Sequence, residues 1–302
     1  MDNEDRKGGL IDKVKAVLEF ARIEHTLFAL PFAFMGVVLA ADGLPSISLL
    51  FWIFAGLVFG RAASLMINDY VDEPIDAVNP RTDDRPLPSG RLSHPEAWIL
   101  IAASSLLLFF CAYQINFTAF VLSPAILVTA VVYPYIKRYS WISHLVLGLN
   151  GSYAPIGGWI AVRAGGDPVR YLEGFNYYPA VILGAALVFW YAGFDIIYSL
   201  QDLDFDREMD LHSIPVVFGR ESALKISAVF HAVMLVFLAW LYLWMTGVGM
   251  ESWIFGVSVL VSAALLGYEH VIAEENTGMA FFTVNAVVSV VVFLGVCGAV
   301  FL

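Results

Sequence analysis

Residues 47–76 read ISLLFWIFAGLVFGRAASLMINDYVDEPID, and this segment is the most informative about the fold. Its first part, residues 47–70, is long and apolar enough to cross a bilayer core, which takes a helix of about 20 apolar residues. Its last part changes character and gathers amide and carboxylate side chains between Asn68 and Asp76. The stretch therefore predicts a transmembrane helix with an acidic end.

The composition extends this conclusion to the whole chain. Of its 302 residues, 60% are of the types AVILMFWYC and only 14% are charged, whereas soluble proteins carry about 25% charged residues. So few charges cannot solvate the surface of a soluble enzyme, and a net charge of −11 argues against a nucleic-acid partner. The cysteines Cys111 and Cys297 lie in separate apolar runs, which argues against a disulfide framework or a zinc cluster. The chain is predicted to be an integral membrane protein.

Nine apolar windows of transmembrane length lie between polar or Gly/Pro-containing breaks. They cover residues 25–41, 47–70, 96–114, 117–136, 141–162, 178–200, 222–246, 252–272 and 279–301. We therefore expect an all-α, polytopic membrane protein that forms a single domain over residues 1–302. Residues 1–24 form a cytoplasmic or interfacial amino-terminal segment, in which the apolar spacing from Leu10 to Phe20 predicts an amphipathic helix.

The distribution of lysine and arginine predicts the orientation of the chain. If the amino terminus is cytoplasmic, thirteen of the 16 basic residues lie in the terminus and the inside loops, and only Arg163 and Arg170 lie outside. This asymmetry follows the positive-inside rule. The inside loops after the second and sixth spans are also the longest and most charged. We therefore expect the amino terminus and the active site on the cytoplasmic side, in a prokaryotic cell membrane.

Acidic and amide side chains recur every four residues at the ends of the second and sixth spans. The first set is Asn68, Asp72 and Asp76, and the second is Asp202, Asp206 and Asp210. Side chains four residues apart share one face of a helix, although Pro74 is expected to disturb the last turn before Asp76. Arg61 and Asp195 each lie seven residues before a set, two turns deeper in the span. Two acidic clusters from two helices are thus predicted to meet at one membrane depth.

Clustered carboxylates repel one another, and neither set contains enough basic residues to neutralise it, so a cation is needed. Oxygen ligands without His or Cys favour Mg²⁺, which binds one or two carboxylates and takes its other ligands from water and phosphate. Basic residues on the same face favour a diphosphate, since guanidinium groups bind phosphate in a bidentate manner. They are Arg81, Arg85, Lys137 and Arg138, with Tyr133 at the start of the last group. The simpler interpretation, a solvated acidic face, does not account for the ionisable Arg61 and Asp195 within spans.

These motifs together resemble the UbiA-type intramembrane prenyltransferases. The matching elements are Asn68-Asp69-x-x-Asp72-x-x-x-Asp76, Arg81-Thr-x-x-Arg85-Pro-Leu-x-Ser-Gly, Tyr133-x-Tyr135-x-Lys137-Arg138, Asp195-x-x-Tyr198-x-x-Gln201-Asp202-x-x-x-Asp206 and His212-Ser213-Ile-Pro215-Val-x-Phe218-Gly219. They occur in order over essentially the whole chain. The resemblance implies nine transmembrane helices around a central cavity, with a lateral opening for an isoprenoid tail.

The resemblance also implies roles for the motif residues. It assigns Mg²⁺ binding to Asn68, Asp72, Asp202 and Asp206, with Asp69 and Asp76 assisting. Lys137 and Arg138 would contact the diphosphate, and Asp195 would lie near the acceptor as a base. Arg61 would bind an anionic acceptor or pair with Asp195. The extra acids Asp204 and Asp210 leave open which carboxylates of the second set face the metal.

The leading functional hypothesis is Mg²⁺-dependent transfer of a prenyl group from a prenyl diphosphate to an aromatic acceptor, such as 4-hydroxybenzoate or a quinone precursor. Aromatic side chains could stabilise the allylic cation through their π faces. The candidates are Tyr70, Tyr153, Trp159, Tyr191 and Tyr198. One alternative is transfer to geranylgeranylglyceryl phosphate in archaeal lipid synthesis. A more distant one is an ion-coupled transporter, which predicts paired broken helices at the bilayer midplane. The lipid bilayer and the two substrates are the expected partners, with no required protein partner.

Overall fold

The computed structural model describes residues 9–22, 26–41, 44–164, 168, 177–273 and 275–302, and over these ranges every regular element is helical. The first half contains α1 (Leu10–Ala21), α2 (Thr26–Ala40), α3 (Ile47–Asp76), α4 (His94–Ile115), α5 (Phe117–Leu122), α6 (Pro124–Ile136) and α7 (Ser143–Arg163). The second contains α9 (Tyr178–Ser199), η2 (Leu200–Asp202), α10 (Leu203–Glu208), α11 (Ile214–Phe218), α12 (Arg220–Gly247), α13 (Trp253–Ile272), η3 (Met279–Val284) and α14 (Asn285–Phe301). The predicted all-α fold is confirmed.

Among the described residues, eight helical segments are long and apolar enough to cross a membrane. Two of them, α5 with α6 and η3 with α14, combine elements that the sequence predicts as the single spans 117–136 and 279–301. A third, α9 with η2 and α10, continues beyond the predicted span 178–200. The predicted span 25–41 corresponds to α2, whose 15 residues are fewer than the roughly 20 that a perpendicular span needs. The predicted count of nine is therefore approximate, with eight full-length spans and one shorter apolar helix.

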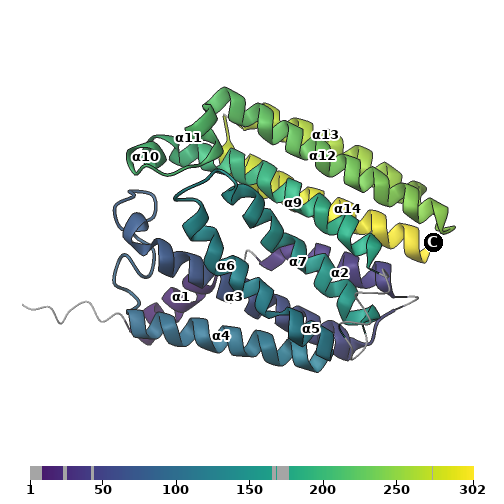
Figure 1. The fold of residues 1–302 in the computed structure, drawn as a ribbon, viewed down its shortest axis with the longest axis horizontal. Coiled ribbons are helices and arrows are strands. Elements are labelled where there is room, and N and C mark those ends of the chain that lie inside the picture. The colour runs from purple at the N-terminus through teal and green to yellow at the C-terminus, as the bar shows by residue number, and fades with distance from the viewer. Residues whose placement is uncertain (1–8, 23–25, 42–43, 165–167, 169–176, 274) are drawn as a thin grey trace, which may run out of the picture.

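The long helices lie side by side, and α9 is at the centre of the packing, in contact with α7 on one side and α12 on the other (Figure 1). Trp190 of α9 is completely buried in the largest core cluster. Gly148 allows α7 to approach α9 closely, because a Cβ atom there would collide with the backbone of Val188. Small residues at such crossings are characteristic of helix packing in membranes. The close contact fixes the relative positions of the side chains that α7 and α9 carry.

The end of α3 is more regular than predicted, and the segment after α9 is less regular. Helix α3 continues through Pro74 to Asp76, so the expectation that Pro74 disturbs the last turn is wrong. Helix α9 ends at Ser199 and is followed by the 3-10 turn η2 and the short helix α10. Asp210 lies beyond α10 with a left-handed backbone (φ 54°) and is exposed. The predicted i+4 ladder therefore ends at Asp206.

Helix α1 forms where the sequence predicts an amphipathic helix. Ala16 and Phe20 are fully buried against the bundle, whereas Ile11, Val14 and Leu18 are exposed. Lys13 forms an ion pair of 2.9 Å with Glu96 of α4, which attaches the helix to the body of the protein. Figure 1 shows α10, α11 and the connection between α3 and α4 at the same end of the bundle. The charged segments of the chain thus gather at one end.

Candidate active site

A cavity of about 580 Å³ opens between the ends of α3 and α9. Its lining includes most of the residues that the sequence predicts for the site. They are Arg61, Asn68, Asp69, Asp72, Asp76, Arg81, Arg85, Tyr133, Lys137, Asp195, Asp202 and Asp206. The two acidic sets, more than 120 positions apart in the sequence, therefore face one space.

The carboxylates of α3 are buried and paired with basic side chains. Asp69 accepts two hydrogen bonds from Arg22, at 2.8 and 3.0 Å. Asp76 pairs with Arg85 at 2.5 Å, and Lys137 pairs with Asp72. Burial of a carboxylate is costly unless it is paired and hydrogen-bonded. The cations around the first acidic set therefore stabilise its charge.

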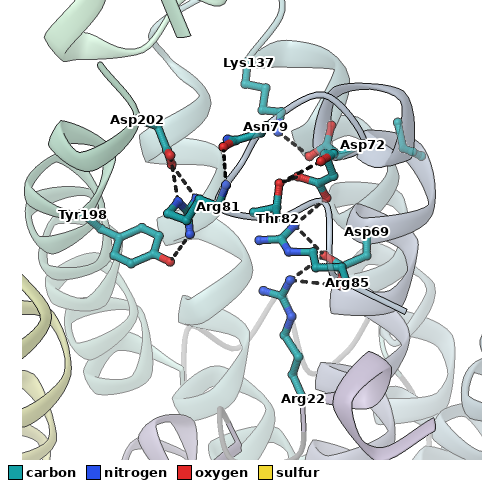
Figure 2. Close-up of polar contacts among 12 residues, drawn as sticks. Arg22, Asp69, Asp72, Asn79, Arg81, Thr82, Arg85, Lys137, Tyr198 and Asp202 are labelled. Atoms are coloured by element: carbon teal, nitrogen blue, oxygen red, sulfur yellow. Dashed lines mark hydrogen bonds and ion pairs between the residues drawn. The ribbon is translucent and has the colours of Figure 1, made fainter. Parts of the chain in front are cut away.

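Arg81 connects the first half of the site to the second. Its Nε and terminal nitrogen donate to both oxygens of Asp202, at 2.7 and 2.5 Å, and its other terminal nitrogen donates to the Tyr198 hydroxyl at 2.9 Å (Figure 2). Burial lowers the pKa of the Arg81 guanidinium, but its bonds to Asp202 and Tyr198 outweigh burial and hold the pKa above its ordinary value. Arg81 is thus a permanent cation between the loop after α3 and the end of α9.

Three charged residues considered for the site lie outside the cavity lining. Arg138 is half-buried behind Asp72, donates to the carbonyl oxygen of Val71 at 2.7 Å and lies 3.6 Å from Asp72 Oδ1. The Asp204 side chain is 95% exposed and lies 3.6 Å from Arg207. Asp210 is also exposed. Of the acids that the sequence left open in the second set, Asp202 and Asp206 are the ones that line the cavity.

Asp195 and Arg61 lie deeper in the cavity. Asp195 pairs with His144, whose Nδ1 is 2.7 Å from Asp195 Oδ2. The described residues contain no ion pair between Asp195 and Arg61, so the pairing considered for them is not observed. The buried Nε of Arg61 has no hydrogen-bond partner there. Arg61 therefore lines the cavity as a cation that is not paired with Asp195.

A second, mainly apolar cavity of about 280 Å³ shares Arg61 and Asn150 with the first. Residues of α2, α3, α4, α5, α6 and α7 line it, among them Ile53, Gly60 and Leu108. The polar site thus borders an apolar chamber within the membrane-spanning part of the bundle.

Sequence reasoning missed Arg22, His144 and Asn150, all of which line the polar cavity. Arg22 contributed only to the count of inside charges, and His144 and Asn150 belong to no motif. Arg22 pairs with Asp69, 47 residues away, and His144 pairs with Asp195, 51 residues away. His144 and Asn150 are polar residues within the predicted span 141–162, and this alone could have indicated them.

Four aromatic rings line one wall of the cavity: Tyr191, Phe194, Tyr198 and Phe281. Their ring centroids follow one another at 4.8 Å from Tyr191 to Phe194, 5.4 Å from Phe194 to Phe281 and 4.3 Å from Phe281 to Tyr198. The other aromatic candidates lie elsewhere: Tyr70 accepts from Trp98, Tyr153 lines the apolar cavity, and Trp159 belongs to the core.

The oxygen ligands in the cavity fit a hard divalent ion that takes its remaining ligands from a phosphate. The buried oxygens Asn68 Oδ1 and Asp72 Oδ1 have no hydrogen-bond partner in the described part of the chain. Within that part, no three His, Cys, Asp or Glu side chains lie close enough to hold a metal ion by themselves. Mg²⁺ is commonly bound in this way, through one or two carboxylates together with substrate phosphates.

The sequence matches the UbiA prenyltransferase family over residues 29–285. The chain belongs to this family. The resemblance predicted from the motifs is therefore confirmed, and the long apolar helices are those of an integral, multi-pass membrane protein.

Similar proteins cover the same length of chain. The 4-hydroxybenzoate octaprenyltransferase of Vibrio vulnificus is 31% identical over 94% of this chain and 97% of its own, and that of Aeromonas hydrophila is 32% identical over 93% and 95%. The apo structure of a UbiA homologue from Aeropyrum pernix K1 superposes with a TM-score of 0.80 at 33% identity, over 91% of this chain and 98% of that one. A UbiA homologue from Archaeoglobus fulgidus, bound to GPP and Mg²⁺, shares the fold with a TM-score of 0.67 at 20% identity, over 93% and 99%.

Proposed function

We propose that this protein transfers the prenyl group of a prenyl diphosphate to an aromatic acceptor of the 4-hydroxybenzoate type, with Mg²⁺ as cofactor and diphosphate as the second product. The convergence of two acidic helix ends on one cavity, with oxygens on Asn68 and Asp72 that have no hydrogen-bond partner among the described residues, carries this proposal. The names of the relatives support the choice of acceptor. The Mg²⁺ in the structure of the Archaeoglobus fulgidus homologue supports the choice of metal.

The diphosphate would lie between the two acidic sets. The residues that would hold Mg²⁺ are Asn68, Asp72, Asp76, Asp202 and Asp206. When bound, the metal supplies positive charge that offsets the charge developing on the leaving diphosphate. Arg81, Arg85 and Lys137 line the same space and would bind phosphate oxygens, with Tyr133 beside them. Arg138 would act across Asp72, because its guanidinium lies outside the lining.

Loss of diphosphate leaves an allylic cation at C1 of the prenyl chain. The aromatic wall formed by Tyr191, Phe194, Tyr198 and Phe281 would stabilise this cation through its π faces. Placing the reaction among packed helices keeps water away, which prevents hydrolysis of the reactive intermediate. The adjoining apolar cavity is the part of the molecule that suits the isoprenoid tail.

Arg61 and Asp195 would act on the acceptor. The guanidinium of Arg61 suits the carboxylate of 4-hydroxybenzoate, since it can bind both oxygens at once. Asp195 would accept or polarise the phenolic proton and so make the ring more electron-rich. Asp69 is held by Arg22 and lies 3.5 Å from Arg85, so its contribution would be to position these two cations beside the diphosphate.

The orientation is part of the proposal: the cavity opens on the cytoplasmic side of a prokaryotic cell membrane, where the positive-inside asymmetry places the charged end of the bundle. Geranylgeranylglyceryl phosphate is the second candidate acceptor. The fold likeness to digeranylgeranylglyceryl phosphate synthase, at 21% identity and a TM-score of 0.69, does not favour it over an aromatic acid. Membership of a prenyltransferase family leaves the transporter alternative without support.

Purified protein, Mg²⁺ and a radiolabelled prenyl diphosphate, incubated with each acceptor separately, test the proposal. We expect labelled 4-hydroxybenzoate product from wild type, none from D72N or D202N, and wild-type turnover from the matched control D204N, whose side chain is 95% exposed. If product forms only with geranylgeranylglyceryl phosphate, that compound replaces 4-hydroxybenzoate as the proposed acceptor. Normal turnover by both D72N and D202N would refute the metal assignment.

A further inference from the structure

His144 makes two hydrogen bonds that together determine which of its ring nitrogens carries a proton. The residue is 3% exposed at the start of α7. The backbone nitrogen of Ile214 lies 3.1 Å from His144 Nε2, and Asp195 Oδ2 lies 2.7 Å from Nδ1. A backbone N–H can only donate, so Nε2 must accept and carries no proton. The imidazole is therefore neutral, with its proton on Nδ1, and Nδ1–H donates to Asp195.

We propose that His144 is a positioning residue for Asp195: it binds Oδ2 of the carboxylate through Nδ1–H and leaves Oδ1 for the acceptor in the cavity. Ile214 imposes the tautomer that makes this possible. The inference rests on the proposed function, in which Asp195 acts on the acceptor. His144 itself touches Asp195 and Ile214, and its effect on the reaction passes through Asp195.

The surroundings of His144 hold its ring in place, so that it can orient the Asp195 carboxylate. The Asp195 side chain lines the cavity with 15% of its surface exposed, and the bond to His144 restricts its rotamer. His144 is held on α7, which packs closely on α9. Residues 212–214 complete the support, because the backbone nitrogen of His212 also donates to the carbonyl oxygen of Lys137 at 3.0 Å. Supporting shells of this kind fix a reactive group in its productive geometry.

Two conservative substitutions separate the two hydrogen bonds. The amide nitrogen of asparagine occupies nearly the place of histidine Nδ1, so H144N retains a donor for Asp195 and loses the acceptor for Ile214. The amide group of glutamine reaches the place of Nε2, so H144Q retains an acceptor for Ile214 and loses the donor for Asp195. A merely structural role for His144 predicts no such difference in kinetics.

The first measurement is steady-state transfer at saturating Mg²⁺ and prenyl diphosphate. Misplacement of a catalytic group can cost about 100-fold in rate, so we expect H144Q to lower kcat/KM for the acceptor about tenfold or more and H144N to restore most of it. KM for the prenyl diphosphate should stay near the wild-type value in both. In the double variant H144Q/D195N the loss should equal that of D195N alone, because the two residues act as one unit. Equal rates for H144N and H144Q, or additive losses in the double variant, would overturn the proposal.

The second measurement is made on wild-type protein and does not depend on the proposed function. ¹⁵N spectra of wild-type protein labelled at histidine, assigned by the signal missing in H144N, or in an alanine variant if H144N does not fold, report the tautomer directly. We expect an unprotonated Nε2 and a protonated Nδ1 for His144. The opposite tautomer, or an imidazolium, overturns the proposal even if transfer proceeds. Conversely, absence of transfer by wild type with every acceptor defeats the proposed function while the spectra still decide the tautomer.

Discussion

Substitution of Gly148 by alanine should impair this protein at the crossing of α7 and α9. A Cβ at Gly148 would lie 2.8 Å from the carbonyl carbon and Cα of Val188 and closer still to its carbonyl oxygen, whereas ordinary contacts begin at 3.4 Å. The obstacle is backbone, which cannot rotate aside as a side chain can. The two carbon contacts alone require the helices to separate by about 0.6 Å, and the oxygen requires more.

The expected losses follow from this displacement. Overpacking of this size costs about 1–3 kcal/mol of stability, against which the higher helix propensity of alanine returns about 1 kcal/mol at most. His144 lies one turn before Gly148, and Asp195 lies two turns after Val188. A misplacement of about 1 Å in a catalytic arrangement can cost about 100-fold in rate, so we expect a fall in kcat of tenfold to about 100-fold.

The assay compares G148A with G267A, a glycine-to-alanine change in α13 where a Cβ would meet nothing within 4 Å. Thermal unfolding in detergent should show a lower midpoint for G148A and a midpoint at or above wild type for G267A, where alanine gains helix propensity without a collision, and prenyl transfer should fall only in G148A. A G148A protein with wild-type midpoint and turnover would contradict the close approach of α7 and α9. An equal loss in G267A would assign the effect to glycine replacement in general.

Three further predictions concern single interactions. W190F removes the indole N–H that donates to the buried Asn285 Oδ1 at 2.7 Å. Loss of this hydrogen bond should cost about 1–3 kcal/mol of stability and lower the midpoint of thermal unfolding. The control W240F, at a residue 46% exposed, should leave the midpoint unchanged. Chelation of divalent cations by EDTA should stop transfer and added Mg²⁺ should restore it in wild type and D204N; transfer that persists under EDTA would argue against a metal. R81K keeps the charge but cannot make the paired bonds to Asp202 together with the bond to Tyr198. KM for the prenyl diphosphate should therefore rise about tenfold or more. The control R207K, at an exposed position, should behave as wild type.

The helical class, the approximate positions of the spans and the face of α3 that carries the candidate site all follow from the amino-acid sequence alone. These properties are local: a run of apolar residues must satisfy its own backbone hydrogen bonds in lipid, which requires a helix, and a spacing of four then places Asn68, Asp72 and Asp76 on one side. The same periodicity failed at the end of α9, where the 3-10 turn and the left-handed Asp210 end the regular spacing.

The partners of these residues depend on how the helices pack together. The packing brings Arg22 to Asp69, His144 to Asp195 and Arg81 to Asp202, across separations of 47, 51 and 121 residues. It also turns Asp204 outward and leaves Arg138 behind Asp72. Such pairings depend on how closely and at what rotation two helices pack, and that depends on small residues such as Gly148 and on the shapes of both faces together. No pattern within one segment contains this information.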